Sequence, residues 1–303
     1  MECAAVGNGG RAQVVSRKRV VLIPGDGVGP EVVGAAQSAL DALGGLDVSE
    51  AASPADCRDA DAILAGPFAD DDTEAELARE LRLFAHLRPA RPLRGLTARS
   101  PLTDDRVAAM DVMLVSGDGP PDALARIAAA AARHRRGHVT WHGPFSEALE
   151  VYDDVVAEPA TVEALAARLV GAPAQLDVVL CPPSVADVLA PVASTLTGVP
   201  TVQARALVGA GPGVFAPAHG PEPRVAGRPA VSPLGALRAT ALLLRHGLEL
   251  DEPARRLERA LDATLASGLR TPEIAAGEPG ERPANTLALV SHLLSHLRAR
   301  VEA

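Results

Sequence analysis

The side chains that could do acid–base chemistry are few in type, because the 303-residue chain has one lysine, Lys18, and one tyrosine, Tyr152. A residue type that is absent can contribute nothing to a site. Nearly all of the 29 basic residues are arginines, whose planar guanidinium can hold a carboxylate through two parallel hydrogen bonds. A GC-rich coding bias is the simplest explanation for this preference and for the abundant alanine.

Turns rich in glycine, proline or aspartate separate short apolar runs from amphipathic stretches three times in the first half of the chain. This order predicts strand, turn and helix, and its repetition predicts a parallel sheet. Residues 70–72 are three aspartates that either cap the second helix or form a solvated loop, and we favour the loop. The predicted strands and the helices that follow them span residues 20–23 and 31–43, 60–64 and 73–86, and 111–115 and 123–135.

The second half of the chain predicts further strands, a long loop and a helical C-terminal part. Asp251 is expected to cap the penultimate helix and Gly268 to end it. The predicted elements are strand 176–180, helix 184–196, strand 201–204, loop 209–233 and helices 234–246, 252–267 and 286–301.

Composition and charge exclude several classes of protein. The formal charge of −9 and the lack of a basic cluster argue against a nucleic-acid partner. The longest apolar runs are too short to span a bilayer, so we expect no membrane segment. Residues 1–19 lack the apolar middle of a secretory signal, and the three cysteines suggest no disulfide framework, so we expect a cytoplasmic protein.

Four blocks stand out in the chain: residues 23–32 (IPGDGVGPEV), 84–89 (FAHLRP) with 100–102 (SPL), 216–233 (with HGPEPRVAG at 219–227) and 268–274 (GLRTPEI). In this order they resemble the motifs of the isocitrate and isopropylmalate dehydrogenase family, the metal-dependent, β-decarboxylating 2-hydroxyacid dehydrogenases. The resemblance covers nearly the whole chain. It implies an α/β, two-lobed fold in which helices flank a largely parallel central sheet.

The resemblance also implies how the lobes and subunits are organised. Residues 1–18 are an N-terminal tail, 19–104 and 234–303 form the large, nucleotide-side lobe, and 105–233 form the small lobe. The small lobe contains the dimer-facing region and has the cofactor loop at its end. The active site lies between the lobes and is completed by a second subunit, so we expect a homodimer or a heteromer with a related chain. Compared with the family, the arm that clasps the partner subunit and the segment that should hold the tyrosine are deleted here, between Gly117 and Ala123.

A carboxylate substrate and a divalent metal are implied by the same resemblance. Arg88 matches an arginine that binds the substrate, and Asp187, with Glu163 of a partner subunit, matches ligands of Mg²⁺ or Mn²⁺. The alternatives are a surface salt bridge for the arginine and helix-terminus electrostatics for the two carboxylates. The family's two further arginines and its second metal carboxylate fall here on Ala78, Ser116 and Pro191.

The family's acid–base pair is a lysine and a tyrosine, and neither has a counterpart here. The lysine position falls on Pro144 or on His142, depending on the direction of the alignment. Lys18 precedes the first strand, away from the carboxyl ends of strands where ligands of open α/β sheets bind. Tyr152 follows the lysine position instead of preceding it. His142 could transfer a proton or be an ordinary surface histidine, and we favour the second.

The cofactor loop is the block that matches the family best. It implies that a nucleotide, NAD or NADP, is bound by His219, Gly220, Pro223, Arg224, Val225 and Ser232. Arg224 stands where NAD-using relatives carry an acid that bonds the ribose hydroxyls. A cation there would pair with a 2′-phosphate, so we predict NADP in preference to NAD, unless Arg224 merely reflects the arginine bias.

Two functional hypotheses result. The first is an NAD(P)- and metal-dependent oxidative decarboxylase of a 2-hydroxy acid with a β-carboxylate, of the 3-isopropylmalate or isocitrate dehydrogenase type. The second is a catalytically impaired relative that acts as a regulatory subunit or a nucleotide-binding module. The order of the blocks favours the first hypothesis, and the missing acid–base residues favour the second.

Overall fold

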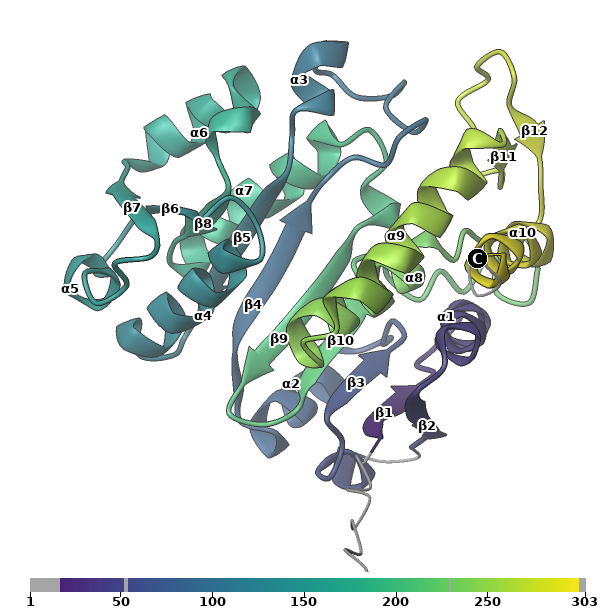
Figure 1. Cartoon of the computed structure of the whole chain (residues 1–303), viewed down its shortest axis with the longest axis horizontal. Helices are drawn as coiled ribbons and strands as arrows, with labels where there is room; N and C mark the ends of the chain where they lie inside the picture. The colour runs from purple at the N-terminus through teal and green to yellow at the C-terminus, as the bar shows by residue number, and fades with distance from the viewer. Residues whose placement is uncertain (1–16, 52–53, 229, 300–303) are drawn as a thin grey trace, which may run out of the picture.

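The computed structural model describes residues 17–51, 54–228 and 230–299, and the structural statements below concern those residues. The strands of the main sheet are β1 (Lys18–Ile23), β2 (Leu46–Glu50), β3 (Ala62–Ala65), β4 (Leu83–Ala90), β5 (Val112–Gly117), β6 (His138–Trp141), β7 (Val156–Pro159), β8 (Val178–Leu180), β9 (Ala204–Gly209) and β10 (Gly213–Pro217). Their order is β2-β1-β3-β10-β9-β4-β5-β8-β6-β7, as Figure 1 shows. Two short strands, β11 (Leu269–Arg270) and β12 (Arg282–Pro283), form a separate parallel pair.

Most neighbouring strands run parallel, which confirms the expected sheet. The exceptions are the antiparallel pairs β10–β9, β9–β4 and β4–β5. It follows that β1, β2, β3, β10 and β4 point in one direction and the other strands of the sheet in the opposite direction. The carboxyl ends of β1, β3, β10 and β4 therefore lie at one edge of the sheet, the kind of edge at which α/β proteins bind ligands.

Helices cover both faces of this sheet. The helices are α1 (Gly29–Leu43), α2 (Asp71–Glu80), α3 (Asp104–Ala108), α4 (Pro121–Arg133), α5 (Ser146–Leu149), α6 (Val162–Gly171), α7 (Pro183–Leu196), α8 (Leu234–Leu242), α9 (Asp251–Ala266) and α10 (Thr286–Arg298), with short turns η1 (Pro54–Cys57), η2 (Pro173–Gln175), η3 (Pro200–Val202) and η4 (Leu243–Gly247). One face packs against α1, α4, α8, α9 and α10 through a core of alanine, valine and leucine. The other face packs against α2, α6 and α7. In Figure 1, α9 crosses in front of the sheet.

Strand β4 has a side chain pattern that separates the two faces. Ala85 and Leu87 belong to the core under α4, α8 and α9, whereas Ala90 packs with α6 and α7. Successive side chains of a strand point to opposite faces. Arg88 and Pro89 are therefore directed to different faces of the sheet.

The glycine-rich turn after β1 connects three parts of the fold. Gly25 and Gly27 have φ angles of 72° and 58°, a region that L side chains rarely adopt. The Asp26 amide donates to the carbonyl oxygen of Pro67 at 2.8 Å, and the Val28 amide donates to that of Pro221 at 2.8 Å. The turn thus holds the start of the loop at 218–233 against the body of the protein.

Several local expectations were wrong. The predicted helix 73–86 ends at Glu80, and residues 83–86 belong to β4. The solvated-loop interpretation of residues 70–72 fails, since the Asp70 carboxylate accepts a hydrogen bond from the Thr73 amide at 2.9 Å and caps α2. Asp251 caps nothing through its side chain, which instead lies 3.3 Å from Arg245 Nε. Residues 201–202 fall in η3 instead of a strand, and the predicted loop 209–233 contains β10.

Among the described residues, the predicted lobes share one ten-stranded sheet, so the sheet order does not mark a boundary between them. The lobe boundaries at residues 104 and 234 therefore stay predictions. Residues 1–16 of the predicted tail lie outside the described residues, and Lys18 already belongs to β1. No helix in the described part of the chain is both long and apolar enough to cross a bilayer.

Candidate functional site

The structure brings together two residues that the sequence nominated for different tasks. Arg88, on β4, faces α7, and its Nη1 lies 2.9 Å from Oδ1 of Asp187, on α7. The side chains are 28% and 62% exposed, so both remain accessible from solvent. The guanidinium can exchange this carboxylate for that of a ligand. Substrate binding by Arg88 stays a prediction.

A group of half-buried and buried polar side chains lies near this ion pair. His86 precedes Arg88 by two residues, lies on the same face of β4 and is opposite Ser116 of β5. Burial, with the positive charge of Arg88, lowers the pKa of His86, so this imidazole is neutral at physiological pH. It can then accept a proton or share a hydrogen bond.

A half-buried ion pair lies on the β9 side of this group. Glu74, on α2, binds Arg205, on β9, through both of its carboxylate oxygens. Burial alone would raise the pKa of Glu74, but the hydrogen bonds to Arg205 and its charge outweigh burial, and the pKa is lowered. Glu74 therefore stays charged, and its ion pair with Arg205 connects α2 to β9 next to His86 and Arg88.

Cys181, just after β8, lies on the other side of Arg88. Burial raises the pKa of its thiol to about 12, although the charge of Arg88 acts in the opposite direction. The thiol is therefore uncharged at physiological pH and is no nucleophile. The sequence analysis did not single out His86, Glu74, Arg205 or Cys181; the period-two alternation around Arg88 was the available signal for His86.

The metal expected from the resemblance does not fit this chain by itself. The oxygen Oδ1 of Asp187 is bound by Arg88, and one turn further along α7 stands Pro191, which has no donor atom. In the described part of the chain, no three His, Cys, Asp or Glu side chains converge as metal ligands would. Glu163 lies exposed in the first turn of α6, where backbone and Thr161 hydrogen bonds lower its pKa. Metal binding by Asp187 and Glu163 stays a prediction that requires a second subunit.

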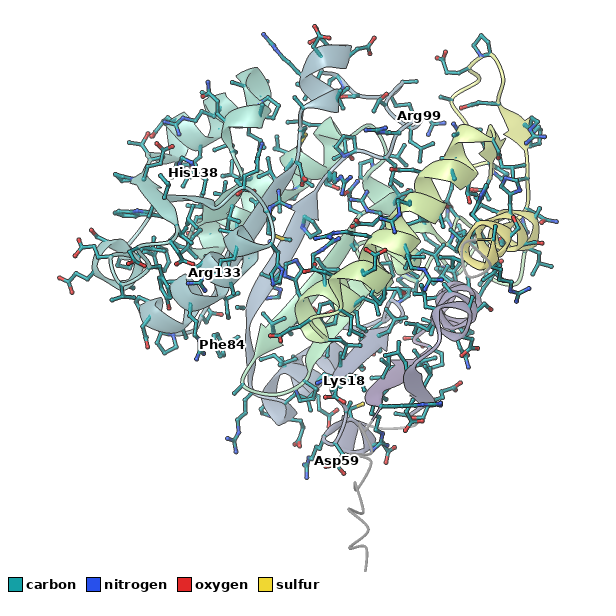
Figure 2. The ribbon with its side chains drawn as sticks, viewed as in Figure 1. Lys18, Asp59, Phe84, Arg99, Arg133 and His138 are labelled. Atoms are coloured by element: carbon teal, nitrogen blue, oxygen red, sulfur yellow. The ribbon has the colours of Figure 1, made fainter. Side chains whose placement is uncertain are left out.

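The lysine and the tyrosine do not enter the site. The Lys18 ammonium lies 3.0 Å from Asp61 at the start of β1, and Figure 2 shows Lys18 and Asp59 on the opposite side of the molecule from Arg99. The Tyr152 ring lies under the guanidinium of Arg133, at 5.4 Å. His142 is half-buried after β6 and hydrogen-bonds through Nδ1 to the Ala160 carbonyl at 3.0 Å.

The loop expected to bind the nucleotide follows β10 and leads into α8. His219 Nδ1 is 2.8 Å from the Gly220 carbonyl oxygen, whereas Nε2 is buried with no hydrogen-bond partner among the described residues. Pro223 and Arg224 are exposed and Ser232 is buried. An orphaned imidazole nitrogen and an exposed guanidinium are groups that a nucleotide's polar atoms could satisfy, so these residues fit a nucleotide cofactor.

Glu273 lies beneath this loop and was missed by the sequence analysis. Burial raises its pKa to about 7, and the nearby charge of Glu222 adds to this, while a hydrogen bond from the Ser232 backbone opposes it. Its carbonyl oxygen accepts a hydrogen bond from Arg99 Nη1 at 3.0 Å. Glu273 can therefore change its charge near neutral pH, next to the candidate nucleotide site.

A family model and sequence comparison with known proteins give the same assignment. The family described as isocitrate/isopropylmalate dehydrogenase matches residues 123–291. The 3-isopropylmalate dehydrogenase of Rhodopirellula baltica is 30% identical over 335 aligned residues, covering 86% of this chain and 93% of that protein. That of Anaeromyxobacter dehalogenans is also 30% identical, covering 84% and 94%.

The solved structures agree on the fold. The isocitrate dehydrogenase of Methylococcus capsulatus superposes with a TM-score of 0.76 at 21% identity, covering 93% of this chain and 99% of that one. At this identity the likeness shows the fold alone, and the family follows from the sequence matches. The chain belongs to the isocitrate/isopropylmalate dehydrogenase family.

Proposed function

We propose that this protein is an NAD(P)-dependent oxidative decarboxylase of a 2-hydroxy acid with a β-carboxylate, of the 3-isopropylmalate dehydrogenase type. The observation that carries the proposal is the similarity to 3-isopropylmalate dehydrogenases over 86% of the chain. The position of Arg88 on β4, with its guanidinium accessible, supports it further. Arg88 would bind a substrate carboxylate after releasing Asp187.

The nucleotide is assigned to the loop at 218–233. When bound, it supplies the hydride acceptor. His219 and the open backbone at Gly220 would contact it, with Ser232 toward the adenine. Arg224 would pair with a 2′-phosphate, so NADP is the preferred form. Pro223 and Val225 shape the same loop.

The reaction is expected to be slow. Loss of a general acid or base costs about 10²- to 10⁴-fold in rate, and the site lacks both the lysine and the tyrosine of the family. His86 lies beside Arg88, and burial together with the charge of Arg88 lowers its pKa, so it is a neutral imidazole that could accept a proton from a bound substrate. We therefore expect turnover well below that of relatives that retain the pair.

A second candidate function is a nucleotide-binding regulatory subunit without turnover. The ion pair between Arg88 and Asp187 favours it, because each group of the expected substrate and metal sites neutralises the other. This function uses the same loop and the same nucleotide.

We also propose that a second copy of this chain, or of a related one, completes the site. Val188 and Val192, one turn apart on α7, are 64% and 38% exposed, which leaves an apolar strip on that helix. A partner packed there would bring a carboxylate such as its own Glu163 toward Asp187. Light scattering on the purified protein gives the mass; a monomer at micromolar concentration refutes this part of the proposal.

The test is NADPH formation from 3-isopropylmalate and from isocitrate with Mn²⁺, alongside calorimetric titration with NADP. Slow turnover that Arg88→Gln abolishes, and that Arg126→Gln on the exposed face of α4 leaves intact, supports the decarboxylase. NADP binding without any turnover supports the regulatory subunit. Neither turnover nor nucleotide binding would refute both.

A further inference from the structure

A cavity of about 740 Å³ lies on the face of the sheet that Arg88 does not reach. Pro89 and Met113, which are opposite each other on β4 and β5, form part of its floor. Its walls come from the end of α4 and from α8, η4 and α9. Because alternate side chains of β4 point to opposite faces, the sheet itself separates this cavity from the site around Arg88.

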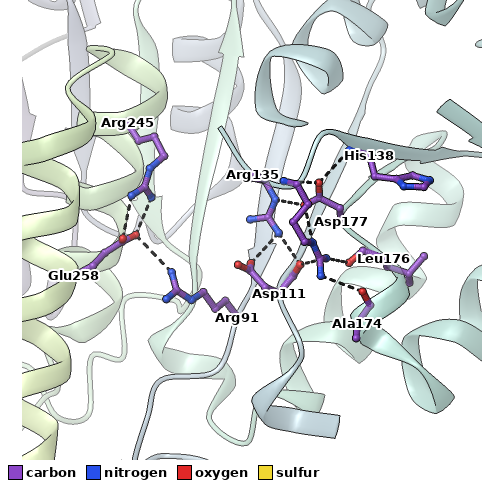
Figure 3. A network of polar contacts seen from close by, with 10 residues as sticks. Arg91, Asp111, Arg135, His138, Ala174, Leu176, Asp177, Arg245 and Glu258 are labelled. Carbon is purple, nitrogen blue, oxygen red and sulfur yellow. Dashed lines mark hydrogen bonds and ion pairs between the residues drawn. The ribbon is translucent and has the colours of Figure 1, made fainter. Parts of the chain in front are cut away.

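Arginines outnumber carboxylates in the walls of this cavity, seven to four. Figure 3 shows the ion pairs of three of these four carboxylates, Asp111, Asp177 and Glu258. Asp177 and Asp111 both bind Arg135, at 2.7 and 2.8 Å, and Glu258 binds Arg245 at 2.8 Å. The carboxylates therefore neutralise the arginines at the two ends of the cavity and leave an excess of positive charge between them.

Arg238 is the centre of that excess charge. It projects from α8, whose neighbouring residues Leu237 and Ala239 are fully buried. Its Nη1 is buried and has no hydrogen-bond partner among the described residues. Burial and the nearby charge of Arg91 lower the pKa of Arg238 to about 10, so it stays charged at physiological pH. Arg238 as a whole is half-buried, but a buried guanidinium nitrogen without a hydrogen-bond partner is unfavourable and gains from an anion that binds it.

Arg91, the residue after β4, also lines this cavity. Its Nη1 is 3.9 Å from Glu258, a carboxylate that Arg245 already holds through both oxygens. Arg91 thus has guanidinium hydrogens to offer a ligand. His246 adds no charge, because burial lowers its pKa to about 3.

We propose that this cavity is a binding site for a small polyanion, a molecule that carries two or more phosphate or carboxylate groups, with Arg238 and Arg91 as its main contacts. Planar guanidinium groups match both kinds of anion through paired hydrogen bonds. The site is distinct from the cofactor loop and from Arg88, so the proposal does not depend on catalytic activity. A ligand there would connect α8 with the end of β4.

The test is calorimetric titration of the full-length protein with pyrophosphate and, separately, with citrate, in buffers matched in ionic strength with sodium chloride. Saturable binding of pyrophosphate alone indicates phosphate recognition, and binding of citrate alone indicates carboxylate recognition. Either result supports the proposal. Absence of saturable binding by both at millimolar concentration overturns it.

Variants locate the binding. Arg238→Met removes the buried guanidinium and should weaken binding about tenfold or more, the loss expected for a charge-assisted hydrogen bond. Arg126→Gln removes the same charge from an exposed position on α4, and the double variant R88Q/R224Q removes charge from the other candidate sites; both should bind normally. If Arg238→Met does not fold, Arg91→Gln serves in its place. Unchanged binding in the cavity variant, or loss in the double variant, refutes the assignment.

Discussion

Replacing Glu273 by glutamine should stabilise the protein at alkaline pH and leave its stability unchanged at acid pH. Burial raises the pKa of this carboxyl from 4.5 to about 7. A carboxyl whose pKa is higher in the folded than in the unfolded state favours folding below the unfolded pKa, and this contribution is lost as the pH rises through the folded pKa. Above about pH 7 the wild-type protein must therefore hold a charge that glutamine does not carry.

The size of the effect follows from the same shift. A change from 4.5 to about 7 corresponds to about 3 kcal/mol. Because the side chain is partly exposed, solvent screening reduces this to about 2 kcal/mol. For a chain of this length, such a difference raises the melting temperature by about 4 °C. Below about pH 4 the two proteins should melt together, because the carboxyl is then protonated in the unfolded state as well as in the folded state.

The measurement is thermal unfolding of both proteins from about pH 4 to about pH 8, with the exposed Glu76→Gln on α2 as the matched control. The difference in free energy of unfolding between wild type and Glu273→Gln should grow as the pH rises, with its midpoint between the unfolded and folded pKa values of the carboxyl. The control should stay within about 0.5 kcal/mol of wild type at every pH. A difference that is constant with pH, or larger in acid, would show that Glu273 is not held in a poorly solvated position.

Four further predictions concern the cofactor loop, the glycines near it and in α1, and the substrate-side group. Arg224→Glu should weaken NADP binding by about tenfold or more and leave NAD binding nearly unchanged, as titrations with both nucleotides would show; equal losses would contradict a 2′-phosphate contact. Gly27→Ala places a Cβ 1.9 Å from a carbonyl oxygen of the cofactor loop, at a φ of 58°, and should cost about 2 kcal/mol or more in urea unfolding. Gly34→Ala in α1, with open space around it, should be neutral or mildly stabilising. Arg205→Gln should destabilise by about 2 kcal/mol, more at pH 8 than at pH 5, because it leaves the half-buried Glu74 carboxylate unpaired, and solvent reduces the cost below that of a fully buried charge; an unfolding experiment that finds a larger loss in acid would refute this.

The elements that the sequence predicted correctly are those with local signals. Helix α1 follows from the glycine turn and the apolar spacing after it, and the end of α9 follows from Gly268, whose φ is 85°. The helix over 73–86 was extended too far because residues 83–88 fit a helix by composition. Their alternation of buried and half-buried side chains in β4 is instead the period of a strand.

The site was only partly predictable, for reasons of distance along the chain. Arg88 and Asp187 were identified by motif, but their pairing joins residues 99 positions apart and no local pattern encodes it. The pair of Glu74 and Arg205 spans 131 positions in the same way. Such contacts arise only when the sheet order places β9 beside β4, which the periodicity of single segments does not determine.

The role of Arg238 also becomes visible only in the folded structure, where its Nη1 is buried without a hydrogen-bond partner in the described part of the chain. Along the sequence it is one of many arginines, and coding bias explains it as well as function does. Bias, however, acts on every position alike, whereas desolvation acts only where the chain is buried. An arginine fixed by bias alone on a buried helix would be expected to reach solvent or a carboxylate, since both relieve the cost of burial. Its Nη1 reaches neither. The cavity in front of it is therefore better explained by a ligand that supplies the missing negative charge than by the composition of the chain.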